Sequence, residues 1–498
     1  MLEINNLNIS IKDRKYLDNF NLVLKDNDKA AIIGEEGNGK STLLKTIINK
    51  ADYAITQGLI NTHNCHIGYM PQKIEYQGSV FDYLFSTEYD YETAHSTLYR
   101  ELDFLNLQPE LIYRDMETLS GGEKVKVCLL KLKLNRYDLY LLDEPTNDLD
   151  LETLNLLETF INETSEPILF ISHDETLIQN CANIIIHIEQ LRKKTVCSCS
   201  VFYGDYISFT EFRNNTLSIR TRQALSDEKE FAIKKEKLNR LMNKIEYAQN
   251  NVSRQNPHEG YVLKKKMKQL KSQEGKLGSV QLREYPDSEE GISFFFEIVK
   301  SPEGKRILDF SLDKLMIDER ILAKNIHLCL NGGSHIAITG QNGSGKSTLL
   351  HLIYESLKDR KDIKAGYMPQ NYEECFDTEY VLDYLVKDRK AENITKALTM
   401  LGNMKFTKEE MQGPVKDLSG GSKAKAKLIL VKLCLEKYDV LLLDEPSRNL
   451  SPLSCPVLRR ALNGYDGTII MISHDRKLLN ECAHSIYRLD VNGLTQTV

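Results

Sequence analysis

The segment Gly34-Glu-Glu-Gly-Asn-Gly-Lys-Ser41 returns in the second half of the chain as Gly340-Gln-Asn-Gly-Ser-Gly-Lys-Ser347. Both copies follow a short apolar run, residues 29–33 and 334–339, and both lead into a Ser-Thr-Leu-Leu segment that continues as a helix. Glycines at this spacing let successive backbone N–H groups turn toward phosphate oxygens at a helix N-terminus. The two copies therefore predict two phosphate-binding loops, each between a buried strand and a helix.

Four other motifs recur in the same order at an offset of about 300 residues, which identifies an internal repeat. The pairs are Gly68-Tyr-Met-Pro-Gln72 with Gly366-Tyr-Met-Pro-Gln370, Leu119-Ser-Gly-Gly-Glu123 with Leu418-Ser-Gly-Gly-Ser422, Leu142-Asp-Glu-Pro145 with Leu443-Asp-Glu-Pro446, and Ile171-Ser-His-Asp174 with Ile472-Ser-His-Asp475. We predict two homologous domains, residues 1–190 and 305–498, on either side of a unique segment, 191–304. Apolar runs alternate with helical segments in each repeat, so we expect an α/β fold. Further strands are expected at 138–142, 167–171, 439–443 and 468–472.

The composition excludes several broad classes of protein. The 498 residues are 41% hydrophobic and 27% charged, which rules out wholesale disorder. No stretch approaches the roughly 18 apolar residues of a spanning helix, and the N-terminus has no basic or apolar leader pattern. The ten cysteines are scattered, and Cys197 and Cys199 lack a second Cys/His pair, which favours reduced, structural thiols over a metal site. We expect a cytoplasmic protein without a membrane segment.

The unique segment is basic and helical. Residues 191–280 contain 19 Lys and Arg against 9 Asp and Glu, although the whole chain has a net charge of −6. Residues 214–250 contain no Pro or Gly, 251–260 contain turn signals, and 261–277 are again rich in helix formers. This pattern predicts an antiparallel helical hairpin over about 214–280 with a polar tip at 251–261, whose first helix would reach roughly 55 Å.

Five lysines of this segment are expected on one helix face: Lys264, Lys265, Lys266, Lys268 and Lys271. They lie near His258 and Tyr261. A phosphate backbone binds such a face by releasing counterions. The alternative interpretation is a solvated lysine-rich helix.

The motifs at the strand ends supply groups for hydrolysis of a nucleoside triphosphate. Lys40 and Lys346 would neutralise β- and γ-phosphate charge, and the hydroxyls of Ser41 and Ser347 would bind Mg²⁺.

Apolar strands end at Asp143-Glu144 and Asp444-Glu445. Each Asp would orient the Mg²⁺ shell, and each Glu could accept a proton from the attacking water. His173 and His474 each follow the Glu by 29 residues and could sense the γ-phosphate. A lone histidine is more often structural, but the repetition favours the functional interpretation.

These motifs, in this order, resemble the ATP-binding cassette (ABC) ATPases over about 400 of the 498 residues. The resemblance implies that two cassettes enclose two ATP molecules, each phosphate loop facing the Leu-Ser-Gly-Gly signature of the other cassette. Both glutamates are present, so both sites are expected to hydrolyse ATP.

The resemblance carries over residue by residue. The catalytic residues would be Glu144, Glu445, His173 and His474. The first phosphate loop with its glutamine and the first signature would be Gly34, Glu35, Glu36, Gly37, Asn38, Gly39, Lys40, Ser41, Thr42, Gln72, Ser120, Gly121, Gly122 and Glu123. The second set would be Gly340, Gln341, Asn342, Gly343, Ser344, Gly345, Lys346, Ser347, Thr348, Gln370, Ser419, Gly420, Gly421 and Ser422. The Mg²⁺ ligands would be Ser41, Gln72, Asp143, Ser347, Gln370 and Asp444.

The chain departs from the ABC pattern at two places. The position of the usual adenine-stacking aromatic is occupied by Ile11 and Met316, so adenine packs on aliphatic groups or, in the first site, on nearby Tyr16. The first D-loop, 146–150, has the usual final Asp, whereas the second, 447–451, ends in Ser. The two sites are therefore predicted to be inequivalent.

Two cassettes without a membrane domain, joined by a basic helical linker, are similar to the ABC-F proteins, which act on ribosomes. Phe202-Tyr-Gly-Asp-Tyr206 followed by Phe209 resembles the segment that precedes the linker in that family. Gln72 to Leu119 spans 47 residues and Gln370 to Leu418 spans 48, so the arm insertion of some housekeeping members is missing.

A missing arm and a tip at 254–261 resemble the antibiotic-resistance branch (Lsa/Vga-like). The resemblance implies a protein that enters the ribosomal E site, contacts large-subunit rRNA, contacts or displaces the P-site tRNA, and protects against lincosamides, pleuromutilins and streptogramin A. One chain would pair its own cassettes as a monomer, with no DNA or membrane partner. The alternatives are a housekeeping ABC-F translation factor and a twin-cassette ATPase of a membrane importer.

Overall fold

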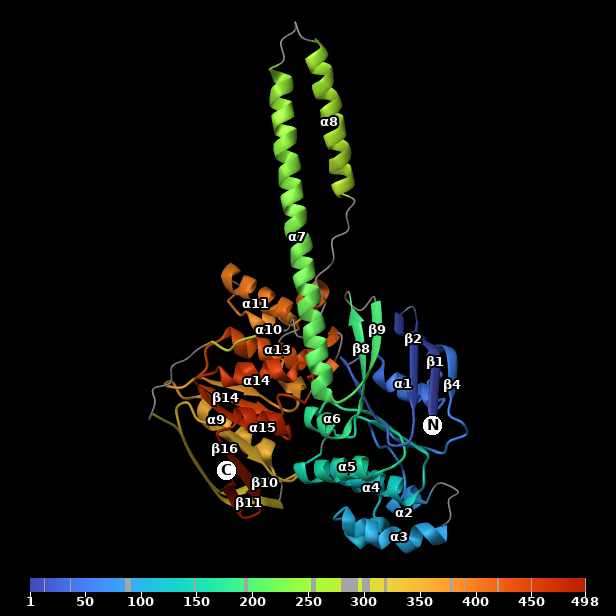
Figure 1. Ribbon diagram of the computed structural model, residues 1–498. Coiled ribbons are helices and arrows are strands. Elements are labelled where there is room, and N and C mark those ends of the chain that lie inside the picture. The colour runs from blue at the N-terminus through green and yellow to red at the C-terminus, as the bar shows by residue number, and fades with distance from the viewer. Residues whose placement is uncertain are drawn as a thin grey trace. The chain divides into compact units, whose positions relative to one another are not determined.

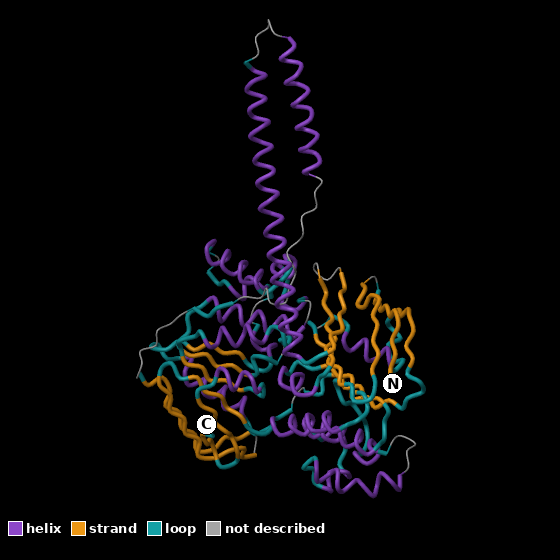
Figure 2. The backbone as a smooth tube through the Cα atoms, in the orientation of Figure 1, coloured by secondary structure: helices purple, strands orange, loops and turns teal. Residues whose placement is uncertain are grey.

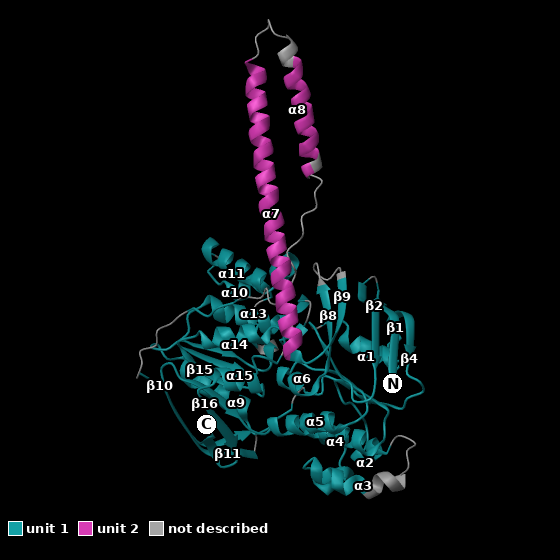
Figure 3. Ribbon diagram, viewed as in Figure 1, with its two compact units in different colours: residues 1–206, 289–498 teal, residues 207–288 magenta. Residues whose placement is uncertain are grey.

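The computed structural model describes most of the chain. It describes all residues except 13, 36, 86–90, 147–148, 192–195, 252–256, 279–293, 298–304, 318–319, 377–378, 389, 419–420, 449 and 498, and it leaves the side chains of 91–96, 191, 196, 257–260, 276, 278, 373–374 and 422–423 undescribed. The chain forms two compact units (Figure 3). One comprises 1–206 and 289–498, and the other comprises 207–288.

The first cassette is built on a six-stranded sheet in the order β5-β6-β7-β3-β8-β9. Strands β8 and β9 of this sheet are labelled in Figure 1. The strands are β3 (Lys29–Ile33), β5 (Ile67–Met70), β6 (Leu139–Asp143), β7 (Ile168–Ile171), β8 (Ile184–Leu191) and β9 (Val196–Tyr203). All neighbours are parallel except β8 and β9. A separate antiparallel sheet contains β2 (Arg14–Leu24), β1 (Leu2–Ile11) and β4 (Ile55–Asn61).

The second cassette repeats this arrangement in the order β13-β14-β15-β12-β16-β17. The strands are β12 (His335–Thr339), β13 (Ala365–Met368), β14 (Val440–Asp444), β15 (Thr468–Ile472), β16 (Ser485–Asp490) and β17 (Gly493–Gln496), with β10 (Arg306–Ile317) and β11 (Arg320–Asn331) as a two-stranded sheet. Strands β3, β6, β12, β14 and β15 are buried at every residue. Their unbroken apolar runs are typical of parallel strands covered on both faces, and the strands expected from the sequence are confirmed.

Helices connect the strands in both cassettes (Figure 2). In the first cassette they are α1 (Lys40–Ile47), α2 (Val80–Leu84), α3 (Tyr91–Phe104), α4 (Gly121–Leu134), α5 (Leu151–Glu163) and α6 (Glu175–Cys181), with 3-10 turns at Pro109–Tyr113 and Met116–Thr118. In the second they are α9 (Lys346–Lys358), α10 (Val381–Leu385), α11 (Ala391–Asn403), α12 (Lys408–Gln412), α13 (Gly421–Leu435), α14 (Cys455–Asn463) and α15 (Arg476–Cys482), with 3-10 turns at Tyr372–Cys375 and Val415–Asp417. The α/β fold with two similar sheets agrees with the prediction.

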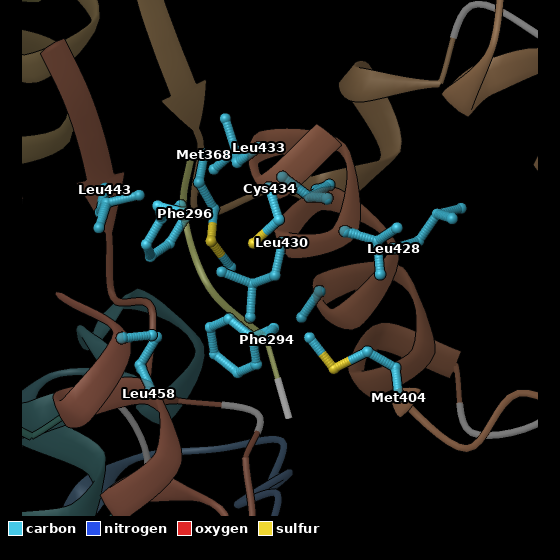
Figure 4. Close-up of a cluster of buried hydrophobic side chains, with 14 of the residues drawn as sticks. Phe294, Phe296, Met368, Met404, Leu428, Leu430, Leu433, Cys434, Leu443 and Leu458 are labelled. Atoms are coloured by element: carbon cyan, nitrogen blue, oxygen red, sulfur yellow. The ribbon is translucent and has the colours of Figure 1, made fainter. Parts of the chain in front are cut away.

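A short segment that follows the helical linker packs into the core of the second cassette (Figure 4). Phe294 and Phe296 are each 6% exposed and belong to the same hydrophobic cluster as Met368 and Leu430. Their ring centroids are 6.1 Å apart, and Phe296 lies 5.6 Å from the ring of Tyr465. The chain is therefore anchored in the second cassette before strand β10 begins.

The second unit is helical. It contains α8 (Pro257–Gly278) and all but the first residue of α7 (Tyr206–Asn250), a helix of 45 residues. Helix α7 begins eight residues before the predicted start at 214, because no helix breaker follows Gly204. Pro257 occupies the first position of α8, where its missing N–H costs no hydrogen bond. The long helical insert agrees with the prediction. Of the predicted tip, residues 252–256 and the side chains of 257–260 lie outside the described residues.

Among the residues that the structure describes, no helix has the length and apolar character that crossing a membrane requires.

Candidate functional site

The last glycine of each phosphate loop has a left-handed backbone and caps the helix after the loop. Gly39 has φ 89° before α1, and Gly345 has φ 91° before α9. A Cβ on Gly39 would lie 2.9 Å from the Tyr16 ring, and one on Gly345 would lie 2.8 Å from Leu315 and Leu322. Glycine alone combines a left-handed backbone with so close an approach. The glycines therefore let each loop turn tightly into its helix, and a helix N-terminus is a favourable place for an anion.

The two loop lysines bend back over their own loops. Lys40 Nζ donates hydrogen bonds to the carbonyl oxygens of Gly34 at 2.8 Å and Glu35 at 3.0 Å. Lys346 Nζ donates to two carbonyl oxygens of the second loop at 2.8 and 2.9 Å. Burial lowers the pKa of Lys346, and the neighbouring carboxylates oppose that shift. Each lysine is positioned where phosphate oxygens would replace the carbonyl groups.

Asn38 has a different role from its neighbours in the first loop. Its side chain is 2% exposed, and its Nδ2 donates to the carbonyl of Ile188 at 3.0 Å. This bond fastens the phosphate loop to strand β8, so the Asn38 side chain holds the loop in place.

Buried carboxylates end the central strands β6 and β14. Ser41 Oγ donates to Asp143 Oδ1 at 2.8 Å. Asp444 is 1% exposed and lies beside the Ser347 hydroxyl, which matches Ser41. Burial raises the pKa of both aspartates, and the serine hydroxyls oppose that shift. A serine hydroxyl and a buried carboxylate are hard oxygen donors that fit Mg²⁺.

The glutamate after each aspartate contacts a histidine. Gln72 Nε2 donates to Glu144 Oε2 at 2.6 Å, and His173 Nε2 lies 3.5 Å from Glu144 Oε1. In the second cassette, the backbone N–H of His474 donates to Glu445 Oε2 at 3.4 Å, and His474 Nε2 lies 3.7 Å from Glu445 Oε1. The structure thus brings each predicted Glu and His together.

Both glutamates have a left-handed backbone, with φ 51° at Glu144 and 50° at Glu445. Such a conformation in a residue other than glycine stores about 1–3 kcal/mol and is concentrated at functional sites. Burial and the adjacent Asp444 raise the pKa of Glu445 to about 8. Burial and the Lys346 ammonium lower the pKa of His474 to about 4. A carboxyl group with a raised pKa is suited to accept a proton.

A cavity of about 540 Å³ surrounds the second phosphate loop and is lined by both cassettes. The second cassette contributes Ile317, Asn342, Gly343, Gly345, Lys346, Ser347, Thr348, Gln370, Asp444, Glu445, Ser447, Arg448, Cys455, Ile472, His474 and Asp475. The first contributes Ser120, Gly121, Gly122, Thr146, Leu149, Leu154, His173 and Asp174. A Cβ on Gly122 would lie 3.8 Å from Asn342 Nδ2. The first signature therefore faces the second phosphate loop, as the resemblance implies.

Some predicted residues lie outside this lining. Gly340, Gln341, Ser344 and Glu123 do not contribute to it. Glu123 completes a capping box at the start of α4, because its Oε2 accepts from the Ser120 N–H at 2.8 Å while Ser120 Oγ accepts from the Glu123 N–H at 3.3 Å. These bonds lower the pKa of Glu123 in spite of its partial burial. Glu123 thus positions the signature helix.

The first site is described in part. The structure describes most of its predicted residues, among them Gly34, Glu35, Gly37, Thr42 and Gln72. It leaves out Glu36, Ser419, Gly420 and the side chain of Ser422. Lys427, on the helix that begins at Gly421, places its Nζ 3.9 Å from Glu35 Oε1. The second signature helix therefore approaches the first phosphate loop.

The two sites differ at the D-loop. Asp150 caps α5 by accepting from the Thr153 N–H at 2.9 Å. Burial lowers the pKa of Lys346 and His474 in the other cassette, and the Asp150 carboxylate partly offsets that fall. Ser451, in the matching position, is fully buried with its Oγ 2.9 Å from Ser454 Oγ. The second site therefore has the Asp150 carboxylate of the first cassette in its surroundings. The matching residue of the second cassette, Ser451, carries a hydroxyl instead.

The predicted adenine contact of the second site, Met316, is next to a residue that lines the cavity. Met316 and Ile317 are each 46% exposed, and Ile317 lines the cavity whereas Met316 does not. The pairing of β10 with β11 shifts register between Leu315 and Met316, and such a shift changes which side chain faces a given side. In the first cassette, Tyr16 lies against the phosphate loop with the Arg14 guanidinium 4.7 Å from its ring centre.

Comparison with known proteins agrees with this geometry. A family model described as ABC transporter matches residues 17–147 and 323–448. The chain is 28% identical to the ribosome protection protein VmlR of Bacillus subtilis, over 99% of this chain and 87% of that protein. It is 27% identical to ABC transporter F family member 2 of Arabidopsis thaliana, over 82% of this chain and 58% of that protein.

The solved structure of RNase-L Inhibitor superposes with a TM-score of 0.59 at 18% identity, covering 95% of this chain and 87% of the other. That likeness supports the fold. Two matched cassette domains, two phosphate loops and a composite cavity together identify an ATP-binding ATPase, and the chain belongs to the ABC transporter family as a tandem-cassette protein.

Proposed function

We propose that this ATPase is a ribosome-binding protein that uses ATP to close its cassettes, enters the E site and protects the ribosome from antibiotics of the peptidyl-transferase centre. The observation that carries the first part is the cavity that the second phosphate loop shares with the first signature. ATP in such a cavity would contact both cassettes at once. Binding would therefore favour the closed pair, since a ligand shifts an equilibrium toward the state it binds better.

Each composite site has residues for every task that hydrolysis requires. In the second site, Lys346 would bind the β- and γ-phosphates, and Glu445 would accept the proton of the attacking water. His474 would hold Glu445 in place through its backbone N–H. Ser347 and Asp444 would hold Mg²⁺, which supplies charge neutralisation on the phosphates when bound. Gln370, which lines the cavity, would complete the magnesium shell.

The first site has the corresponding groups. Lys40 would bind phosphate, Ser41, Gln72 and Asp143 would hold Mg²⁺, and Glu144 would act as the base. Gln72 already contacts Glu144 at 2.6 Å, so the proposed metal ligand and the proposed base are coupled. Hydrolysis would remove the contacts that hold the cassettes together and allow release.

The helical unit supports the ribosomal part of the proposal. Its five clustered lysines are all exposed: Lys264, Lys265, Lys266, Lys268 and Lys271. Tyr261, next to them, is 68% exposed and could stack on an RNA base. The relative VmlR is named a ribosome protection protein. We propose that this face contacts large-subunit rRNA and that the tip at 251–261 contacts or displaces the P-site tRNA.

The test is co-sedimentation of the Glu144→Gln, Glu445→Gln double variant with 70S ribosomes in ATP. Loss of the base without loss of ATP binding should trap the closed form, so the variant is expected in the ribosome pellet while wild type is mostly released. The control is the same variant with ADP. Recovery of the double variant in the ribosome-free fraction in ATP would contradict the proposal.

The drug-related part needs a separate measurement. Expression in a sensitive host should raise the inhibitory concentration of lincosamides, pleuromutilins or streptogramin A. A translation defect in a deletion strain without drug, together with unchanged inhibitory concentrations, would favour a housekeeping ABC-F translation factor instead. Reversal of the five lysines to Glu should reduce both ribosome binding and its dependence on salt.

A further inference from the structure

Two ion pairs link the cassettes at positions that the internal repeat relates to each other. Arg459 on α14 pairs with Glu175 on α6, with Nη1 to Oε1 at 2.7 Å and Nη2 to Oε2 at 3.3 Å. Arg476 on α15 pairs with Glu158 on α5, with Nη1 to Oε2 at 2.7 Å. Both pairs join residues about 300 positions apart in the chain.

The repeat makes these contacts equivalent. From Glu144 and Glu445 to Asp174 and Asp475, matching residues of the two cassettes differ by 301 in number. At that offset Glu158 matches Arg459 and Glu175 matches Arg476. The two pairs are thus the same contact made twice, with the acid always in the first cassette and the base always in the second.

Neighbouring residues extend the same separation of charge. Lys477 Nζ lies 3.1 Å from Glu175 Oε2, and the Arg476 guanidinium lies 3.9 Å from Asp174. The Arg459–Glu175 side chains are only 6% and 5% exposed, and the Arg476–Glu158 side chains are 20% and 19% exposed. Low exposure matters because an unpaired or like-charged group at these positions would be poorly solvated.

One residue of each pair is also held within its own cassette. Arg459 Nε donates to Glu481 Oε2 at 2.8 Å, and Asn180 Nδ2 donates to Glu158 Oε1 at 2.7 Å. The offset of 301 relates Glu481 to Asn180 as well. Arg459 and Glu158 therefore have a partner that holds their direction independently of the other cassette, which reduces the entropy lost on pairing.

We propose that these charges determine which cassettes can pair: the acidic α5–α6 face of a first cassette accepts the basic α14–α15 face of a second cassette and rejects a like cassette. Two first cassettes from different chains would place Glu158 opposite Glu175. Two second cassettes would place Arg459 opposite Arg476. Like charges in contact disfavour a wrong partner strongly. The phosphate loops and signatures are present in both cassettes and cannot make this distinction.

The test uses charge reversal in the full-length chain. Glu158→Arg with Glu175→Arg makes both faces basic, and Arg459→Glu with Arg476→Glu makes both faces acidic. Each double variant is expected to lose about tenfold or more of the ATPase rate. The quadruple variant, which restores opposite charges, should exceed both doubles at least about threefold, with recovery partial because Lys477 and Glu481 are unchanged. Glu163→Arg with Arg460→Glu, exposed residues of α5 and α14, is the matched control.

Mixing gives a second readout. The basic and acidic double variants complement each other only between chains, so an equimolar mixture in ATP should regain ATPase and form a two-chain species by light scattering, whereas each variant alone should not. A quadruple variant no more active than the doubles, together with a mixture that gains neither activity nor mass, would overturn the proposal.

The less buried pair, Glu158 and Arg476, offers variants that are less liable to misfold. Glu158→Arg, Arg476→Glu and their combination reverse side chains that are about one-fifth exposed, and thermal unfolding checks that all three fold. The combination should again exceed both single variants, and failure to do so would count against the proposal. The ATPase rate as a readout rests on the proposed function, and a wild-type protein without ATPase activity would refute that function. The masses of the mixed species would still show whether the charges determine pairing.

Discussion

The cap that Asp150 makes on α5 gives a prediction with a built-in control. The Asp150 carboxylate accepts a hydrogen bond from the Thr153 N–H at 2.9 Å, which satisfies one free donor at the start of this 13-residue helix. Replacing such a cap with Ala typically costs about 1 kcal/mol. For a domain the size of one cassette, that loss corresponds to a fall in Tm of about 2–4 °C. We therefore expect Asp150→Ala to lower the Tm of the first cassette by this amount.

Asp150→Asn separates the cap from the charge. Asparagine caps helices as well as aspartate does, so its Tm should match wild type although the carboxylate near Lys346 and His474 is gone. The assay is thermal unfolding of the full chain without nucleotide, followed by circular dichroism. Equal destabilisation by both substitutions would refute the capping argument and would assign the stability to the charge across the interface.

Three further outcomes are expected at the nucleotide sites. ATP at 100 times its Kd should stabilise the protein by about 2.7 kcal/mol for each occupied site. In a dye-based unfolding assay, Lys40→Ala and Lys346→Ala should each remove the part of the ATP-induced rise in Tm that comes from one site, and the two substitutions together should abolish it. Ile317→Ala should weaken ATP binding at the second site about five- to tenfold by calorimetry, whereas Met316→Ala, outside the cavity, should leave it unchanged; equal effects would contradict the register of β10. Removal of divalent cations with EDTA should reduce phosphate release to background, added Mg²⁺ should restore it, and Asp444→Asn should raise the Mg²⁺ concentration required; hydrolysis that persists in EDTA would exclude the proposed metal site.

The sequence predicted the parts of the site that are contiguous. A phosphate loop brings its own strand, turn and helix, so Lys40 and Lys346 could be placed from local pattern alone. The pairing of the second loop with the first signature followed from resemblance, and the shared cavity agrees with it. Contiguous motifs encode their own geometry.

Features that depend on tertiary contacts could not be read in this way. The strand pairing shifts register between Leu315 and Met316, and Ile317 lines the cavity. No local sequence pattern predicts such a shift. The Arg459–Glu175 pair joins residues 284 positions apart and became meaningful only once the two helices were seen in contact. The matching offset was present in the sequence, and charge comparison between the two repeats would have flagged it.

The left-handed backbone at Glu144 and Glu445 has a consequence for how this protein evolves. Glycine at either position would relieve the strain and make folding more favourable by roughly 1 kcal/mol, yet it would remove the carboxylate. If folding stability alone mattered, glycine would therefore be favoured at positions 144 and 445. The same strained backbone carries a carboxylate in both halves of the chain, so each cassette keeps this group at a cost in folding free energy.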